Sequence, residues 1–200
     1  MGVGGFFGGK MSEKEKMLAG QLYNHYDKQL TIERKEIAEK VYIYNNTRDL
    51  DKQQELLSTM LGKVGNNVEI KVPFMCDYGY NIEIGLNFYS DINLTILDKA
   101  KVSIGDNVIL GPNVQIYTAA HPYNEVQRIK GLEYAKPVTI YDNVWIGGNV
   151  TILLGVKINQ GAIIGAGSVV THDIPPYVIA AGNPCEVIRS ITQEDVHKKW

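Results

Sequence analysis

The sequence predicts a mainly β protein: a left-handed parallel β-helix of hexapeptide repeats, with an N-terminal helical cap and one excursion loop. The main observation is that aliphatic residues return every six positions. They share one frame in two runs, which are Ile104, Leu110 and Ile116, then Ile140, Ile146, Ile152, Ile158, Ile164 and Val170. This frame fails between Tyr117 and Pro137, and the residues before position 63 follow a helical spacing instead.

A six-residue period fits a solenoid in which three short strands close one triangular coil, with the aliphatic markers pointing into the prism. Four positions after each marker stands a small or β-branched residue that a narrow turn accepts: Val108, Val114, Val144, Val150, Val156, Ala162 and Ser168. An amphipathic helix needs a spacing of about 3.6 residues and a sandwich needs strict alternation, so neither fits the markers. Ile84 and Ile104 are twenty residues apart rather than three hexads, which indicates a small insertion near Asp98.

The repeat sets the domain boundaries. Residues 1–10 are glycine-rich, and we assign them to a tail that cloning or an alternative start added. Residues 11–62 form a cap of two or three helices, where Ser12 and Glu15 make a capping-box pattern at the start and Gly62 stands at the position of a helix-terminating glycine. The β-helix occupies residues 63–190 with its excursion loop at 117–137, and residues 191–200 are a C-terminal tail.

Composition narrows the class of protein. A chain of 200 residues with 44% hydrophobic content can bury a core and suggests one domain with an appended subdomain. A net charge of −2 favours neither nucleic acid nor a membrane as partner. Cys76 and Cys185 are the only cysteines, which argues against a disulfide framework and for a reducing compartment. No apolar run is long enough to span a bilayer and no signal peptide is evident, so we expect a cytoplasmic protein.

His121 is the main candidate for chemistry. Of the four histidines, only His121 lies in the loop that interrupts the repeat, and an imidazole there could take a proton from a hydroxyl. From its position alone, a solvated loop histidine without a catalytic role is an equally good interpretation. No Gly-x-Ser-x-Gly motif occurs, so direct transfer is simpler than a covalent intermediate. Without a Cys-x-x-Cys or His-Glu-x-x-His motif we expect no metal. Arg189 could bind a phosphate, although a surface charge is the simpler interpretation.

Several short motifs follow one another in order: CDYGYNIEIG at residues 76–85, NFY at 87–89, IGDN at 104–107, HP at 121–122, NVWIGG at 143–148, IGAGSVVT at 164–171 and GNP at 182–184. This ordered set, preceded by a helical cap, closely resembles the maltose and galactoside O-acetyltransferases from about residue 12 to residue 190. Single hexads are shared by many left-handed β-helices, but the ordered set is specific.

The resemblance implies a homotrimer that binds acetyl-CoA in the groove between neighbouring prisms, with the acceptor beside the loop of the adjacent subunit. His121 falls on the family's catalytic histidine. The resemblance also places Trp145 along the CoA arm, Gly148 and Ala166 at backbone contacts to that arm, Thr171 and Arg189 at the nucleotide end, and Asp77 and Tyr89 on the sugar side.

Three departures from the family pattern matter. Asp91 stands where the galactoside enzymes have an asparagine that helps to orient the reacting hydroxyl, and a carboxylate cannot donate a hydrogen bond to an oxyanion. Asp91 could instead accept from the acceptor, raise the basicity of His121, or slow the enzyme; we group the nearby Asn93 with the acceptor side. His172 stands where the galactoside enzymes have a lysine, and Glu186 where they have an arginine. Binding of the CoA phosphates would therefore depend more on Arg189.

We therefore expect an acetyl-CoA-dependent O-acetyltransferase that acts on a sugar or sugar-like hydroxyl by direct transfer, with His121 as general base. One alternative is a xenobiotic acetyltransferase that modifies an antibiotic hydroxyl, and the helical cap argues for the sugar enzymes. Another is a non-catalytic trimeric β-helix scaffold, which Asp91 keeps open. The sequence does not identify the acceptor.

Overall fold

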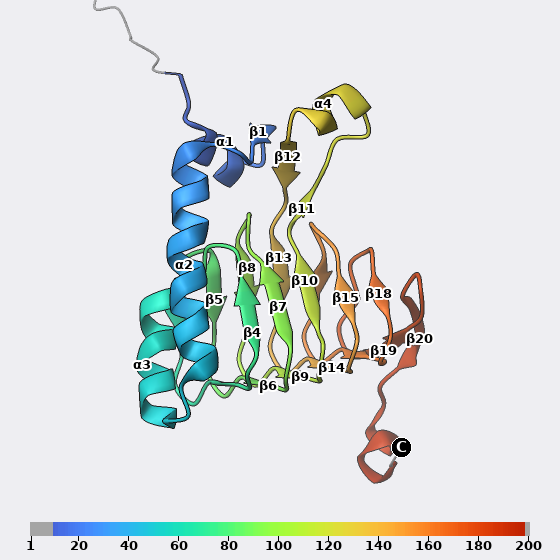
Figure 1. Cartoon of the computed structure of the whole chain (residues 1–200). Coiled ribbons are helices and arrows are strands. Elements are labelled where there is room, and N and C mark those ends of the chain that lie inside the picture. The colour runs from blue at the N-terminus through green and yellow to red at the C-terminus, as the bar shows by residue number, and fades with distance from the viewer. Residues whose placement is uncertain (1–9, 199–200) are drawn as a thin grey trace, which may run out of the picture.

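The computed structural model describes residues 10–198, and the tail predicted over residues 1–10 lies outside this range except for Lys10. The chain folds into a parallel β-helix with helices at its N-terminal end, which confirms the predicted fold class (Figure 1). The helices are α1 (Glu13–Leu18), α2 (Lys28–Asn46), α3 (Leu50–Met60), α4 (Glu125–Ile129) and the 3-10 helix η1 (Gln193–His197).

Three parallel sheets form the faces of the prism. Sheet A consists of β2 (Lys63–Val64), β5 (Ile82–Ile84), β8 (Val102–Ile104), β13 (Val138–Ile140) and β16 (Lys157–Ile158). Sheet B consists of β3 (Glu69–Ile70), β6 (Tyr89–Ser90), β9 (Ile109–Leu110), β14 (Trp145–Ile146), β17 (Ile163–Ile164), β19 (Val178–Ala181) and the antiparallel β20 (Glu186–Ser190). Sheet C consists of β4 (Phe74–Cys76), β7 (Leu94–Leu97), β10 (Gln115–Tyr117), β15 (Thr151–Ile152) and β18 (Val169–Val170).

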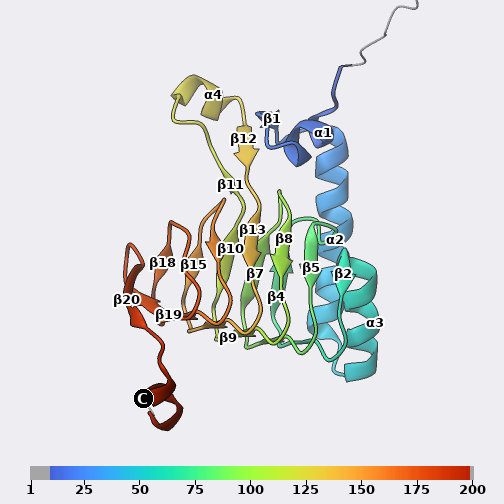
Figure 2. The same ribbon diagram turned by 180° about the vertical axis from the view of Figure 1, so that it is seen from behind.

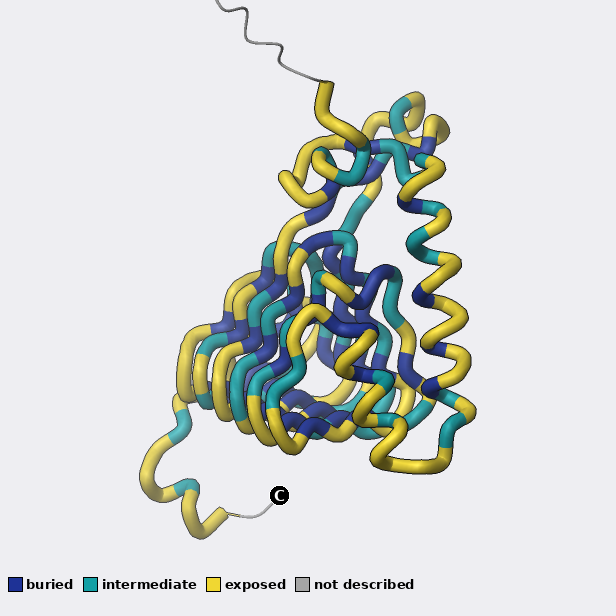
Figure 3. Tube along the Cα trace, turned by 90° about the vertical axis from the view of Figure 1, so that its left-hand side faces the viewer, coloured by how far each residue is buried: buried dark blue, intermediate teal, exposed yellow. Residues whose placement is uncertain are grey.

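The hexad markers fill the inside of the prism, as predicted. All of those from Ile104 to Val170 are buried, and so are the small residues four positions later. Figure 3 looks along the stack of coils and shows buried residues on the inner side of each coil. Each marker stacks on its equivalent in the next coil, as Ile116 pairs with Ile152, so a single apolar column runs through the solenoid.

The coils differ in length, and the differences gather at one corner. Lys63 pairs with Glu83 and Glu83 with Ser103, which gives two coils of 20 residues, whereas Thr139 pairs with Lys157 in a coil of 18. The extra residues lie between sheets C and A, at the corner we call the C–A corner. The insertion predicted near Asp98 is present there, and a second insertion at residues 77–81 was not predicted.

The other two corners are regular and carry asparagine ladders. At the corner from sheet A to sheet B, asparagines in the left-handed region donate side-chain hydrogen bonds from coil to coil, through Asn67, Asn87, Asn107 and Asn143 at 2.9 to 3.0 Å. At the corner from sheet B to sheet C, Asn93 donates to Asn113 at 2.8 Å. Asparagine tolerates this backbone conformation better than most side chains.

The N-terminal helices close the first coil. Ser12 and Glu15 form the predicted capping box, and Tyr44 of α2 donates to the carbonyl of Ile70 at 2.5 Å. Helix α3 ends at Met60 with Leu61 as its C-cap, so Gly62 stands at the predicted position directly after the helix, but its φ is not positive. A Cβ at Gly62 would lie 2.4 Å from the Tyr80 carbonyl oxygen, so close packing requires the glycine. Figure 2 shows α2 and α3 at one end of the stack and β19 and β20 at the other.

The excursion between β10 and β13 has its own secondary structure. It contains β11 (Ala119–Ala120), α4 and β12 (Leu132–Ala135), and β12 pairs on its other edge with β1 (Tyr23–Asn24) of the cap. This three-stranded sheet ties the cap to the excursion, although about a hundred residues separate them in sequence. The predicted tail at 191–200 contains η1.

Candidate active site

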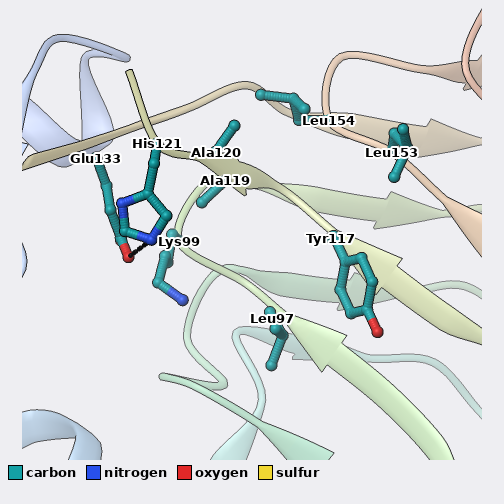
Figure 4. Close-up of a pocket in the computed structure, with 9 residues that line it drawn as sticks. All are labelled: Leu97, Lys99, Tyr117, Ala119, Ala120, His121, Glu133, Leu153 and Leu154. Carbon is teal, nitrogen blue, oxygen red and sulfur yellow. Dashed lines mark ion pairs between the residues drawn. The ribbon is translucent and has the colours of Figure 1, made fainter. Parts of the chain in front are cut away.

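The C–A corner carries a cavity of about 400 Å³ beside His121. The two short insertions and the excursion all leave the prism at this corner, because the flanking strands keep their register. The cavity has an apolar floor and a charged rim (Figure 4). Its lining consists of Leu97, Lys99, Tyr117, Ala119, Ala120, His121, Glu133, Leu153 and Leu154. This size and this mixture of apolar and polar groups suit a small-molecule site.

His121 follows β11 and is about half exposed, with 47% of its side chain accessible. Its Nδ1 lies 3.1 Å from the carbonyl oxygen of Leu132. A carbonyl oxygen only accepts hydrogen bonds, so Nδ1 carries the proton in the neutral ring. The Nε2 atom is then the one that can accept a proton.

A buried carboxylate lies beside this ring. Glu133 is 6% exposed, and its Oε1 is 3.6 Å from His121 Nε2 and 3.2 Å from His25 Nδ1. Tyr23 donates its hydroxyl to Glu133 Oε2 at 2.7 Å. Burial and the Glu133 carboxylate raise the pKa of the Tyr23 phenol well above its usual value, so Tyr23 stays a donor. Burial lowers the pKa of His25, and Glu133 opposes this only partly.

Asp77 and Lys99 form the other charged edge of the corner. The Lys99 ammonium lies 2.6 Å from Asp77 Oδ2, and both side chains are largely buried. Asp98 is fully buried beneath them and accepts the backbone N–H groups of Asp77 and Tyr78 at 3.0 and 2.9 Å. Burial raises the pKa of Asp98 to about 7, against those two hydrogen bonds.

Trp145, expected to bind the cofactor, and Tyr89, expected on the acceptor side, lie on sheet B. Both belong to one outward column, in which Tyr89 pairs with Ile109, Ile109 with Trp145, and Trp145 with Ile163. Trp145 is 41% exposed. This column is aromatic and aliphatic along its length, which suits a thin, partly apolar ligand.

Gly148 and Ala166 follow at the corner from sheet B to sheet C. The coils approach closely there, since a Cβ on the neighbouring Gly147 would lie 2.6 Å from the Ala166 nitrogen. Backbone groups at this corner are therefore near the surface, where a ligand can reach them.

Asp91 and Asn93 also lie at the B–C corner, so within one chain they are not on the corner of His121. The carboxylate of Asp91 accepts the N–H of Ile92 at 2.9 Å and lies 3.5 Å from the Lys71 ammonium. Asn93 has a φ of 64° and belongs to the asparagine ladder, so its side chain has a structural partner in Asn113.

Thr171 and His172 lie at the C–A corner of a later coil, where Thr171 Oγ1 and His172 Nδ1 are 2.8 Å apart. Arg189 lies on β20 and makes two contacts with Asp195, at 2.7 and 2.9 Å. These contacts raise the pKa of Arg189 and lower that of Asp195. A phosphate that bound Arg189 would compete with Asp195 for the guanidinium.

Four residues of this site were not expected from the sequence: Tyr23, His25, Lys99 and Glu133. The pairing of Tyr23 with Glu133 joins positions 110 residues apart, and no local sequence pattern predicts it. Lys99 carried a weak signal, because it lies in the insertion that the repeat frame revealed.

Among residues 10–198, no group of three or more histidine, cysteine, aspartate or glutamate side chains could hold a metal ion. No helix in the same range is both long and apolar enough to cross a membrane.

Comparison with known proteins identifies both parts of the chain. Residues 16–65 match the maltose acetyltransferase hexapeptide capping motif, and residues 137–172 match the hexapeptide repeat of succinyl-transferase. A putative acetyltransferase of Saccharomyces cerevisiae is 53% identical over 188 residues, which cover 92% of this chain and 96% of that protein.

Two solved structures share the whole architecture. A maltose O-acetyltransferase from Clostridium difficile superposes with a TM-score of 0.87 at 49% identity and covers 92% of this chain and 99% of its own. A galactoside acetyltransferase in complex with coenzyme A gives a TM-score of 0.91 at 40% identity and covers 96% of each chain.

Proposed function

This chain belongs to the maltose and galactoside O-acetyltransferase family of hexapeptide-repeat acetyltransferases, and we propose that it transfers an acetyl group from acetyl-CoA to a hydroxyl of a sugar or sugar-like acceptor. The observation that carries the proposal is the geometry of His121. Its ring lines a cavity of suitable size, and the backbone engages Nδ1, which leaves Nε2 for proton transfer.

In this mechanism His121 acts as general base and then as general acid. Nε2 takes the proton of the acceptor hydroxyl while that oxygen attacks the thioester carbonyl carbon. The new C–O bond forms a tetrahedral intermediate, which collapses with cleavage of the C–S bond. The proton on Nε2 then passes to the departing sulfur, and coenzyme A leaves as the thiol. The acyl group goes directly from donor to acceptor.

The rim of the cavity supports a polyhydroxylated acceptor. Lys99 lines the cavity and can donate to a hydroxyl, and its ion-pair partner Asp77, which lies behind this lining, can accept from a second hydroxyl if the pair loosens. The apolar floor, which includes Leu153 and Leu154, can support the carbon face of a sugar ring. The names of the solved relatives, maltose and galactoside enzymes, agree with this class of acceptor.

We also propose that the active unit is a homotrimer with its sites between subunits. Within one chain, sheet C separates the C–A corner, which holds His121, from the edge that holds Trp145, Gly148 and Ala166. Cyclic three-fold packing would set the C–A corner of one prism against the Trp145 edge of the next, and one groove would then contain both groups. Tyr89 and Asp91 would meet the acceptor from the neighbouring subunit.

Subunit complementation tests this arrangement. At acetyl-CoA concentrations well below KM, His121→Ala chains are expected to be nearly inactive and Trp145→Ala chains about tenfold less active than wild type. Co-expression should give more activity than the two variants mixed after purification, because mixed trimers contain some grooves with His121 from one chain and Trp145 from the other. Light scattering gives the oligomeric state. A monomer, or mixed oligomers with no restored activity, would place the whole site within one chain.

The reaction is tested by release of coenzyme A from acetyl-CoA with a panel of sugars and hydroxylated antibiotics. Wild-type turnover should depend on a sugar, and His121→Ala should lose at least about 100-fold in turnover while acetyl-CoA still binds. Higher turnover in Asp91→Asn would identify Asp91 as the cause of a slower or altered reaction. Turnover on antibiotics alone would make the protein a xenobiotic enzyme, and no turnover without acetyl-CoA binding would leave a scaffold.

A cytoplasmic location is the last part of the proposal. Cys76 and Cys185 are both free, which agrees with a reducing compartment. Fractionation of cells that express a tagged chain tests it, and recovery in a secreted or membrane fraction would contradict it.

A further inference from the structure

Glu133 is a buried carboxylate next to the proposed base, and the family motifs in the sequence did not point to it. Burying a carboxylate costs several kcal/mol unless it is paired and hydrogen-bonded. Tyr23 donates a hydrogen bond to Glu133, and His25 Nδ1 lies 3.2 Å from Glu133 Oε1. The third neighbour, His121, can become a cation. Lys99, the nearest lysine of the cavity lining, is already engaged by Asp77.

The protons on this cluster can be assigned. His121 carries its proton on Nδ1, opposite the Leu132 carbonyl, so the neutral ring has no proton between Nε2 and Glu133. His25 Nε2 is buried without a hydrogen-bond partner among residues 10–198, and His25 Nδ1 lies 3.2 Å from Glu133 Oε1. Tyr23 donates from its hydroxyl.

These assignments make the contact between Glu133 and His121 weak before proton transfer and strong after it. A lone pair on Nε2 gains nothing from a carboxylate 3.6 Å away, whereas an imidazolium is attracted to it, with partial screening because 47% of the His121 side chain is exposed. An interaction that strengthens only as the base takes its proton lowers the barrier and leaves substrate binding unchanged.

The cap and the excursion hold this geometry as one sheet. Tyr23 lies directly across from Glu133 in the pairing of β1 with β12, and the His25 N–H donates to the Gly131 carbonyl at 3.1 Å. Strand β12 also pairs with β11, which leads into His121. Gly131 has a φ of 72°, and a Cβ there would lie 2.3 Å from the Tyr26 ring, so the two segments pack closely.

We propose that Glu133 is the electrostatic and positioning partner of His121, and that the cap, through Tyr23 and His25, holds Glu133 in place for that role. The proposal rests on the proposed acetyl transfer. It gives the helical cap a part in the chemistry in addition to covering the end of the solenoid.

The test compares Glu133→Gln, Tyr23→Phe and the double variant with Glu125→Gln as a matched control, because Glu125 is an exposed glutamate of the same excursion. We expect Glu133→Gln to lower kcat about 100-fold while KM for acceptor and acetyl-CoA stays within about threefold. Tyr23→Phe should lower kcat several-fold, and this loss should disappear in the Glu133→Gln background, because Tyr23 acts through Glu133. Glu125→Gln should match wild type.

Three results would overturn the proposal: wild-type kcat in Glu133→Gln, a raised acceptor KM at unchanged kcat, or losses that multiply fully in the double variant. If Glu133→Gln does not fold, Tyr23→Phe decides, since a kcat loss at unchanged KM supports the proposal and wild-type kcat rejects it. His121→Ala separates the two hypotheses. If His121→Ala keeps its turnover, the proposed function is wrong. If His121→Ala loses turnover while Glu133→Gln keeps it, only the proposed role of Glu133 is wrong.

Discussion

The stability of the fold should fall as the pH rises from 5 to 7, and Asp98→Asn should remove most of that fall. Asp98 is fully buried, and burial raises its pKa to about 7 in the folded chain, against an ordinary value of 3.8. Between these two values the unfolded chain has lost the proton while the folded chain keeps it. Stability therefore decreases by up to about 1.4 kcal/mol per pH unit, and by about 2 kcal/mol in all from pH 5 to pH 7, because the slope halves where the pH reaches the folded pKa.

Urea unfolding followed by circular dichroism at pH 5 and pH 7.5 measures this at one fixed protein concentration, because an oligomer's stability depends on concentration. Asparagine keeps an oxygen to accept the N–H groups of Asp77 and Tyr78, so the variant isolates the charge. Asp173→Asn is the matched control, since Asp173 is an exposed carboxylate that also accepts a backbone N–H. If the free energy of unfolding depends on pH equally in wild type and in Asp98→Asn, the folded chain does not keep this proton, and the reasoning is refuted.

Three further predictions concern the core, a corner and the cofactor edge. Ile152→Ala should lower the free energy of unfolding by about 2–5 kcal/mol, because Ile152 is fully buried inside the prism; a loss below 1 kcal/mol in urea unfolding would contradict that packing. Asn107 has a φ of 56° and bonds to its neighbours in the ladder, so Asn107→Ala should cost about 1–2 kcal/mol and Asn107→Gly less; equal costs in urea unfolding would show that the ladder, which both variants lose, dominates over the backbone. Trp145→Ala should raise KM for acetyl-CoA about tenfold with little change in kcat, and steady-state kinetics with unchanged KM would remove Trp145 from the cofactor site.

The prism and its core could be predicted because a solenoid is built from local repeats. A six-residue period determines which side chains point inward, and every predicted marker from Ile104 to Val170 is buried. The capping box at Ser12 could be predicted for the same reason, since it depends on residues three apart. The position of Gly62 after a helix was predicted, but the reason for a glycine there was not, because close packing against the Tyr80 carbonyl depends on a residue far along the chain.

The active-site cluster could be predicted only in part, because its contacts are long-range. His121 was found through the break in the repeat, which is a local signal. Glu133 lies in the same break but becomes informative only when β1 of the cap pairs with β12, and that pairing brings Tyr23 and His25 from the other end of the chain. Periodicity contains no information on a contact of this kind.

The location of the site follows from how a β-helix can accept extra residues. Parallel strands that stack in register cannot lengthen independently, so added residues must leave at a corner. Asparagine ladders join successive coils at the A–B corner through Asn87 and Asn107 and at the B–C corner through Asn93 and Asn113, and an insertion there would break a side-chain hydrogen bond in each adjoining coil. The C–A corner has no such ladder among the described residues, and it is where the insertions and the excursion emerge. The regular corners thus hold the coils in register, and the irregular corner is left to carry the cavity, the base and the charged groups around it.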